Sequence, residues 1–133
     1  MRKLNQNKIF DEVINDSTIQ AQIVDLNQDQ LQHGLDSVGD STGEYSKTSV
    51  NVYGKTPGKI VLKDTGEFYD SMKVAQSSDS FYVSGDTIKE GGVNLLDRWP
   101  DALGLTDESI AEILPEISEK SVEIILETIL EWS

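Results

Sequence analysis

The most regular feature of this sequence is its last segment, which we predict to be a helix from about Glu116 to Glu131. Residues four apart lie on one side of an α-helix, and four glutamates recur there at that spacing, which makes one acidic stripe. The acidic stripe consists of Glu119, Glu123, Glu127 and Glu131. The opposite side carries Ile117, Ile124, Ile125, Ile129 and Leu130, with Val122 and Leu126 between. A helix this apolar requires contact on more than a narrow stripe.

The acidic stripe is open to several interpretations. It can be the solvated face of a core helix, or it can face a basic partner surface or a passage for DNA that must not adhere to it. Divalent metal binding is a weaker alternative, because carboxylates at this helical spacing do not need a metal.

Charge is unevenly distributed over the 133 residues, whose net charge is −13. Residues 1–44 carry −5, residues 45–75 carry +2 and residues 76–133 carry −10. Most of such a surface repels nucleic acid and anionic membranes. The lysine-bearing middle segment can instead pair with an acidic surface, including the C-terminal third of a neighbouring copy in a head-to-tail contact. Solubility alone is the simpler explanation of the same charge.

Apolar residues at helical spacing predict two helices in the N-terminal part, over Met1–Asn15 and from about Ser17 to Gln32. The segment Asn15–Ser17 supplies a break and a cap between them. Gly34 is predicted to end the second helix in the left-handed conformation that glycine tolerates. The loop Gly34–Ser46 is rich in glycine, serine and aspartate, and we expect it to order only on assembly.

The middle of the chain predicts a mainly antiparallel sheet of four strands, because the connections between its strand-like segments are too short for helical crossovers. The strands are expected at Thr48–Tyr53, Lys59–Lys63, Met72–Ala75 and Ser80–Ser84, paired as two hairpins. In the first strand Val50 and Val52 lie on one side. Between the hairpins, Glu67–Ser71 is predicted to be a short helical turn that Asp64 or Thr65 caps.

Towards the C-terminus, Val93–Trp99 is predicted to be a short helix, and Thr106 is predicted to cap the next one. Pro115 interrupts the apolar pattern of that helix, so we expect a kink or a restart there. Together these segments predict a single α+β domain over residues 1–133. It has N-terminal helices, a mainly antiparallel four-stranded sheet, and C-terminal helices packed on that sheet.

Chemistry that depends on cysteine is excluded, because the sequence contains none. His33, the single histidine, precedes the helix-ending Gly34, where its side chain can complement the helix C-terminus. No serine-elbow or phosphate-binding glycine motif accompanies it. We therefore predict no enzyme activity, catalytic residue, cofactor or metal, and an enzyme built from carboxylates around His33 is the alternative. No apolar run is long enough for a membrane span, and no signal segment is expected.

One block in the middle of the chain, Leu62–Ser71 (LKDTGEFYDS), contains a T-G-x-aromatic-x-x-S pattern that a hairpin follows. Two loop segments, Asp36–Gly39 and Gly43–Ser46, and the segment Leu103–Glu108 before the last helix add to it. The pattern at Thr65–Ser71 resembles small virion-morphogenesis and tail-completion proteins of tailed phages, and the blocks together resemble short phage proteins of poorly described function. The resemblance implies a head–tail connector, neck or tail-completion protein that forms a ring in the virion, after synthesis in the host cytoplasm.

We therefore predict a structural virion protein that self-associates and docks on neighbouring portal, neck or tail proteins. It would let genomic DNA pass without specific binding, and it would contact no membrane. The predicted contact residues are Lys55, Lys59, Lys63, Phe68, Tyr69, Glu119, Glu123, Glu127 and Glu131. The alternative is a monomeric acidic binding module or inhibitor that covers a basic partner, because the acidic stripe fits that role equally well.

Overall fold

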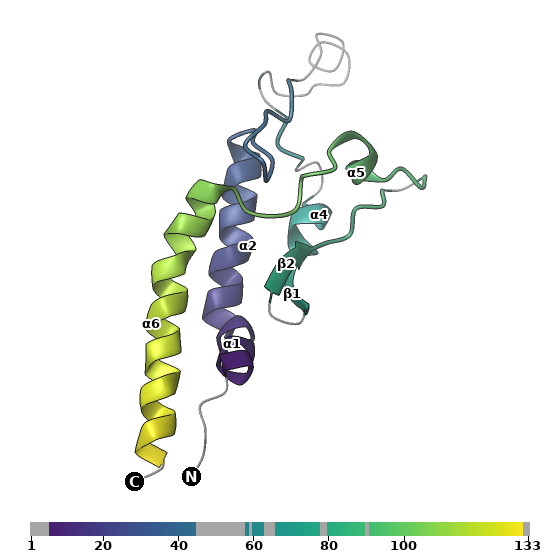
Figure 1. The fold of residues 1–133 in the computed structure, drawn as a ribbon. Coiled ribbons are helices and arrows are strands. Elements are labelled where there is room, and N and C mark those ends of the chain that lie inside the picture. The colour runs from purple at the N-terminus through teal and green to yellow at the C-terminus, as the bar shows by residue number, and fades with distance from the viewer. Residues whose placement is uncertain are drawn as a thin grey trace.

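The structure of the chain is a computed structural model that describes residues 6–44, 58, 60–62, 66–77, 80–89 and 91–131. Its elements are α1 (Gln6–Ile14), α2 (Ser17–Gln32), α4 (Glu67–Asp70), β1 (Lys73–Ser77), β2 (Ser80–Ser84), α5 (Leu95–Arg98) and α6 (Asp107–Glu131). Figure 1 shows α6 running alongside α2, with α1 at the lower end of α2 and the hairpin at its other side in this view. The fold is α+β with helices at both ends, as predicted, but α6 packs mainly on α1 and α2, where packing on the sheet was predicted.

Both predicted N-terminal helices are confirmed as α1 and α2. The Asp16 side chain caps α2 by accepting hydrogen bonds from the backbone N–H groups of Thr18 (3.0 Å) and Ile19 (3.1 Å). These bonds satisfy two of the donors that the start of a helix leaves unpaired. Gly34 follows α2 with a φ of 73°, the left-handed conformation that glycine adopts without steric cost.

The sheet has two antiparallel strands where the sequence predicted four. β1 and β2 pair along their whole length, with Val74 opposite Val83, so the second predicted hairpin is confirmed. The first predicted hairpin is not present in the part of the chain that the structure describes. Residues 60–62 are not a strand, because Leu62 has a φ of 57°, which extended backbone does not allow. The predicted strand Thr48–Tyr53 lies outside the described residues.

The segment that was predicted to be the second strand is bonded to a loop and to a tyrosine. The Ile60 N–H donates to the Gly43 carbonyl oxygen (2.9 Å), and the Thr42 hydroxyl donates to the Ile60 carbonyl oxygen. The Tyr69 hydroxyl donates to the carbonyl oxygen of Val61. These bonds satisfy backbone groups that a neighbouring strand would otherwise satisfy.

The short helix α4 is present where a helical turn was predicted, but it begins differently. Its N-cap is Gly66, with a φ of 86° and no side-chain hydrogen bond to the start of the helix. The predicted caps, Asp64 and Thr65, lie outside the described residues. The chain therefore enters α4 through a left-handed glycine, in place of a side-chain cap.

α6 is one helix over Asp107–Glu131, longer than the final helix that was predicted. It does not restart at Pro115, where a kink or a restart was predicted. Proline removes one helical hydrogen bond, and both Pro115 and Ala111 are exposed, so water can pair with the freed carbonyl of Ala111. The predicted cap at the start of α6 is confirmed, because the Ser109 N–H donates to the Thr106 hydroxyl (3.1 Å).

The apolar core is formed by α1, α2, α6, the hairpin and the segments between them. Its fully buried members include Val13, Ile23, Leu31 and Ala102. The core therefore joins the two ends of the chain, since α1 and α2 pack against α6.

Two amide side chains of α2 are buried and bind the segment that leads into α6. Asn27 is 0% exposed, its Nδ2 donates to the Ala102 carbonyl oxygen (3.0 Å), and its Oδ1 accepts from the Gly104 N–H (2.8 Å). Gln30 donates through Nε2 to the Gly104 carbonyl oxygen (2.9 Å) and accepts at Oε1 from the Thr106 N–H (2.8 Å). We call Asn27 and Gln30 the buried amide pair. Because each amide nitrogen and oxygen has a partner in that segment, the pair fixes where α6 begins.

The described part of the loop after α2, residues 34–44, contains a hydrogen-bonded turn. The Asp36 carboxylate accepts from the N–H groups of Val38 (3.1 Å) and Asp40 (2.9 Å). The Ser37 N–H donates to the Asp101 carbonyl oxygen (2.8 Å). These bonds hold residues 36–40 in a turn and tie it to the segment before α6, and ordering of Gly34–Ser46 only on assembly stays a prediction.

Candidate functional site

α6 has two apolar sides, and the core covers one of them. Ile113 and Ile124 are buried on this inner side, and Ile117 packs against the same cluster. The inner side faces α1 and α2. Ile129 and Leu130, which the sequence predicted on the same side as Ile124, are exposed. The apolar residues of α6 are therefore divided between the core and the solvent.

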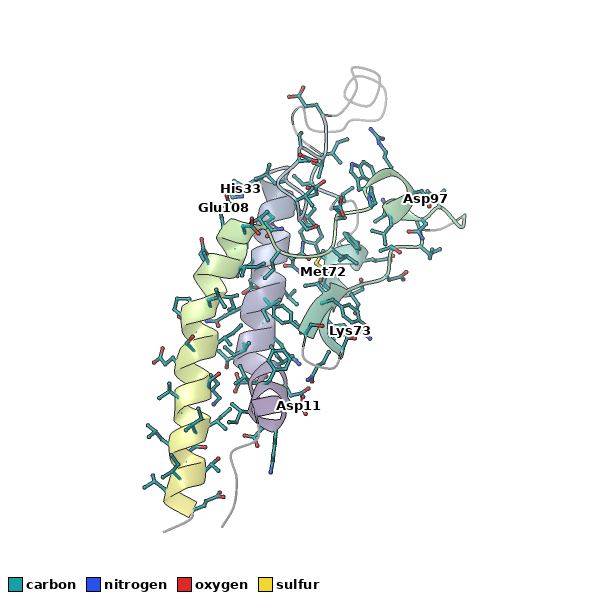
Figure 2. All side chains as sticks on the ribbon, viewed as in Figure 1. Asp11, His33, Met72, Lys73, Asp97 and Glu108 are labelled. Atoms are coloured by element: carbon teal, nitrogen blue, oxygen red, sulfur yellow. The ribbon has the colours of Figure 1, made fainter. Side chains whose placement is uncertain are left out.

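The outer side of α6 carries apolar side chains that solvent reaches. Val122, Leu126, Ile129 and Leu130 have the i, i+4, i+7, i+8 spacing of one helix face and are 55%, 55%, 41% and 71% exposed. We call these four residues the outer apolar face. Leu114, also exposed, lies two turns earlier on the same row. Figure 2 shows side chains in this part of α6 that point away from α1 and α2.

The acidic stripe of α6 is exposed at all four positions, Glu119, Glu123, Glu127 and Glu131. Its last three members each follow directly after a residue of the outer apolar face. Consecutive residues of an α-helix are separated by about 100° around its axis, so the stripe borders the face along one side. A partner that covers the outer apolar face therefore meets negative charge at its margin.

Lys120 connects the acidic stripe to the start of α2. Its Nζ lies 3.5 Å from Asp16 Oδ2 and 3.5 Å from Glu123 Oε1. The charge of Glu123, with a further contribution from Asp16, raises the pKa of Lys120. The hydrogen bond from the Ile19 N–H lowers the pKa of Asp16, and Lys120 lowers it further. This contact joins the middle of α6 to the N-terminal cap of α2.

The two aromatic residues among the predicted contacts do not lie on this surface. Phe68 and Tyr69 are 7% and 3% exposed and belong to the core, where their rings meet edge to face. Neither ring presents a contact surface in this structure. Lys55, Lys59 and Lys63, the predicted basic contact, lie outside the described residues.

A second candidate surface is a hollow of about 440 Å³ beside β2, which we call the β2 hollow. It is lined by Phe10, Ser80, Phe81, Tyr82, Val83, Leu103, Gly104, Leu105 and Ile110. These residues come from α1, from β2, and from the start of α6 with the segment before it. Sequence reasoning missed the β2 hollow, because only the tertiary fold brings its three walls together.

A groove between α2 and α6 is lined by carboxylates. Its volume is about 460 Å³, and the acidic residues of its wall are Asp25, Asp29, Glu112 and Glu116. Over the described ranges, no group of three or more histidine or acidic side chains is placed to hold a metal ion. The groove therefore presents negative charge between α2 and α6.

His33 is part of the C-terminal end of α2, the position that the sequence indicated. Its backbone N–H donates to the carbonyl oxygens of Asp29 and Gln30, and its ring Nδ1 lies 2.8 Å from the Asp29 carbonyl oxygen. Figure 2 shows His33 near the start of α6, where Glu108 lies. The His33 ring therefore pairs with a backbone carbonyl in the last turn of α2.

None of the helices in the described ranges is long and apolar enough to cross a membrane. Comparison of the chain with known protein families, with curated proteins and with solved structures finds no match. The interpretation of its function therefore depends on its own residues and their geometry.

Proposed function

We propose that this chain is a structural subunit that self-associates through the outer apolar face of α6. The observation that carries the proposal is the exposure of four apolar side chains, grouped on a side of α6 that the core does not cover. Large contiguous apolar patches are rare on monomeric soluble proteins, and where they occur they mark interaction sites. A helix face with this spacing fits the side of another helix.

The apolar gain from covering this face is substantial. Full burial of a Val, Leu or Ile side chain contributes about 1.5–3 kcal/mol. Scaled by the exposed fractions of the four side chains, the gain is on the order of 5 kcal/mol for each copy that is covered. Association loses translational and rotational freedom at a cost of about 4–15 kcal/mol. Two covered faces gain on the order of 10 kcal/mol, which lies within that range, so contacts in addition to the outer apolar face would strengthen the assembly.

Charge determines the conditions under which the copies associate. Each copy has a net charge of −13, and the acidic stripe borders the contact. Salt screens the repulsion between copies, so we expect self-association to strengthen as ionic strength rises. Binding of the stripe to a basic partner would instead weaken with salt. The salt dependence therefore distinguishes self-association from the alternative, an acidic binding module. The exposed acidic stripe and the carboxylate-lined groove are the observations that favour this alternative.

The setting that we propose for the assembly is a ring at the head–tail junction of a tailed phage, as a neck, connector or tail-completion protein. The support for this setting is the resemblance of the block Leu62–Ser71 to virion-morphogenesis proteins. Self-association rests on α6 and the setting rests on this block, so self-association can be tested without the setting.

The test of self-association is the molar mass in solution, measured by light scattering over a concentration series in low and high salt. Val122→Glu places a charge in the outer apolar face, and Val38→Glu, at a position 63% exposed in the loop after α2, makes the same change elsewhere. We expect masses above 14.7 kDa for the unmodified chain and for Val38→Glu. Val122→Glu should raise the dissociation constant of the assembly at least tenfold, because a loss of ~1.4 kcal/mol of binding free energy corresponds to a factor of ten.

A chain that remains at 14.7 kDa up to its solubility limit in both salts would contradict the proposal. Equal weakening by both variants would also contradict it, because general charge repulsion would then explain the result. A monomer that binds polylysine in a salt-sensitive way would favour the acidic binding module.

A further inference from the structure

β2 has one edge without a strand partner. β1 occupies the other edge, and the sheet formed by the described residues contains these two strands. The last pair, Ser77 and Ser80, has two residues between its members in the sequence, the spacing at which the two residues exchange both of their backbone hydrogen bonds. Alternation along the pair then directs the N–H and C=O groups of Phe81 and Val83 away from β1. On that side, no backbone hydrogen bond to either residue is found within the described ranges.

The β2 hollow lies along this open edge. Ser80, Phe81, Tyr82 and Val83 all line it, although side chains alternate between the two faces of a strand, so the hollow follows the edge of β2. Apolar residues of α1 and of the region around the start of α6 form the facing wall. None of the nine lining residues is charged, in a chain of which 26% is charged. The hollow therefore fits an uncharged apolar occupant.

The edge of β2 also lacks the features that natural proteins use to prevent pairing. Edge strands are commonly protected by lysine, by proline or by a bulge. The strand Ser80–Ser84 contains neither of these residues, and it pairs with β1 in continuous register without a bulge. An edge of this kind readily accepts an added strand, which is how many proteins bind extended segments.

We propose that this edge binds the segment Thr48–Tyr53 of a second copy as an added strand. The segment (TSVNVY) is uncharged and about as long as β2, and Val50 and Val52 alternate in the way that a strand with one apolar side requires. Those two valines would face the apolar wall of the β2 hollow, while the backbone pairs with Phe81 and Val83. The inference deepens the proposed self-association, on which it rests, by supplying a second contact beside the outer apolar face.

Such a contact is directional. The donor segment and the acceptor edge are different surfaces, so each copy donates to one neighbour and accepts from another. Contacts of this head-to-tail type generate rings when the rotation between copies closes, and filaments when it does not. A contact between identical faces, in contrast, stops at two copies.

The absence of cysteine from the chain allows a direct test by disulfide crosslinking. Asn51 would lie on the same side of the sheet as the 53% exposed Tyr82, because Asn51 alternates with Val50 and Val52, and Tyr82 alternates with Phe81 and Val83. In a variant carrying both Asn51→Cys and Tyr82→Cys, mild oxidation should produce a ladder of multimers of 14.7 kDa. The control variant carries Asn51→Cys with Val38→Cys, which is exposed and remote from β2 in sequence. It should produce at least tenfold less of the ladder.

A synthetic peptide of residues 47–54 supplies the second measurement. Added in excess, it should suppress the ladder several-fold, whereas the same peptide with Val50→Asp and Val52→Asp should not. Equal ladders from the two double-cysteine variants, or a disulfide formed only within single copies, would overturn the strand exchange. If Val122→Glu still lowers the molar mass in that case, the proposed function stands while this inference fails. Circular dichroism of each variant confirms that it is folded.

Discussion

At its N-terminal end α6 is fixed by buried polar groups, whereas its C-terminal half exposes apolar ones. The buried amide pair makes four hydrogen bonds to the segment that leads into α6, and the side chains of the outer apolar face are 41–71% exposed. Both regions depart from the usual distribution of polar and apolar side chains. The difference indicates that polar burial serves to position α6, whereas the exposed apolar side chains are the basis of the proposed contact with another copy.

The largest effect on stability is expected at the buried end. Asn27→Ala removes the partners of the Ala102 carbonyl and the Gly104 N–H, and leaving buried groups unpaired should lower the free energy of unfolding by about 3 kcal/mol. Asn15→Ala is the matched control, because Asn15 is exposed and its Nδ2 donates to one backbone carbonyl, that of Asp11. Its effect should stay within about 0.5 kcal/mol. Urea unfolding measures both, and equal losses would remove the distinction between the two ends.

A smaller effect is expected at the cap of α6. Thr106→Ala removes the hydroxyl that accepts from the Ser109 N–H, which should lower the free energy of unfolding by about 1 kcal/mol. Thr106→Ser keeps the acceptor and serves as the control in the same urea experiment. If the serine variant lost as much as the alanine variant, packing of the threonine methyl group would explain the effect in place of capping.

A pH-dependent effect is expected where the two regions meet, at Asp16 and Lys120. Because the folded-state pKa of Asp16 is lowered, its contribution is present above the unfolded value of about 3.9 and is lost as pH falls through the lower folded value. Asp16→Asn preserves a capping oxygen and removes the charge. Unfolding curves from neutral to acidic pH should show a difference from the unmodified chain that shrinks towards acid. Replacing Lys120 with Gln in both proteins should reduce that difference.

The smallest effect on stability is expected at the exposed end. Val122→Glu should change the free energy of unfolding of the monomer by no more than about 0.5 kcal/mol, since the side chain is already largely in solvent. Urea unfolding at a concentration below that of self-association makes the measurement. A loss of about 2 kcal/mol would show that this face contributes to the core of a single copy, and the comparison between the two regions would be wrong.

Local patterns in the sequence predicted the helices and one hairpin correctly. Asp16 and Gly34 are close in sequence to the helix ends that they determine, so their roles follow from the chain itself. A restart of the helix at Pro115 was wrong, because an exposed helix side tolerates the lost hydrogen bond. The four-stranded sheet was also wrong, because the left-handed backbone of Leu62 is not visible in an apolar alternation.

The functional surfaces were harder to predict, because they depend on contacts between distant segments. Asn27 and Gln30 resembled the solvated side of an amphipathic helix, yet their partners lie more than 70 residues away. The spacing of Val122 and Leu126 was readable in the sequence, but which side of α6 meets the core depends on where α1 and α2 pack. Phe68 and Tyr69 were assigned to a contact and lie in the core, since aromatic residues serve both purposes.

The length of α6 links its two ends mechanically. A helix of 25 residues extends about 37 Å, so a change of about 5° in its direction at Thr106 would displace the Glu131 end by about 3 Å. In a closed ring the same angular error is repeated at every subunit. The buried amide pair lies inside a single copy, yet through the direction of α6 it would then influence how many copies form the ring.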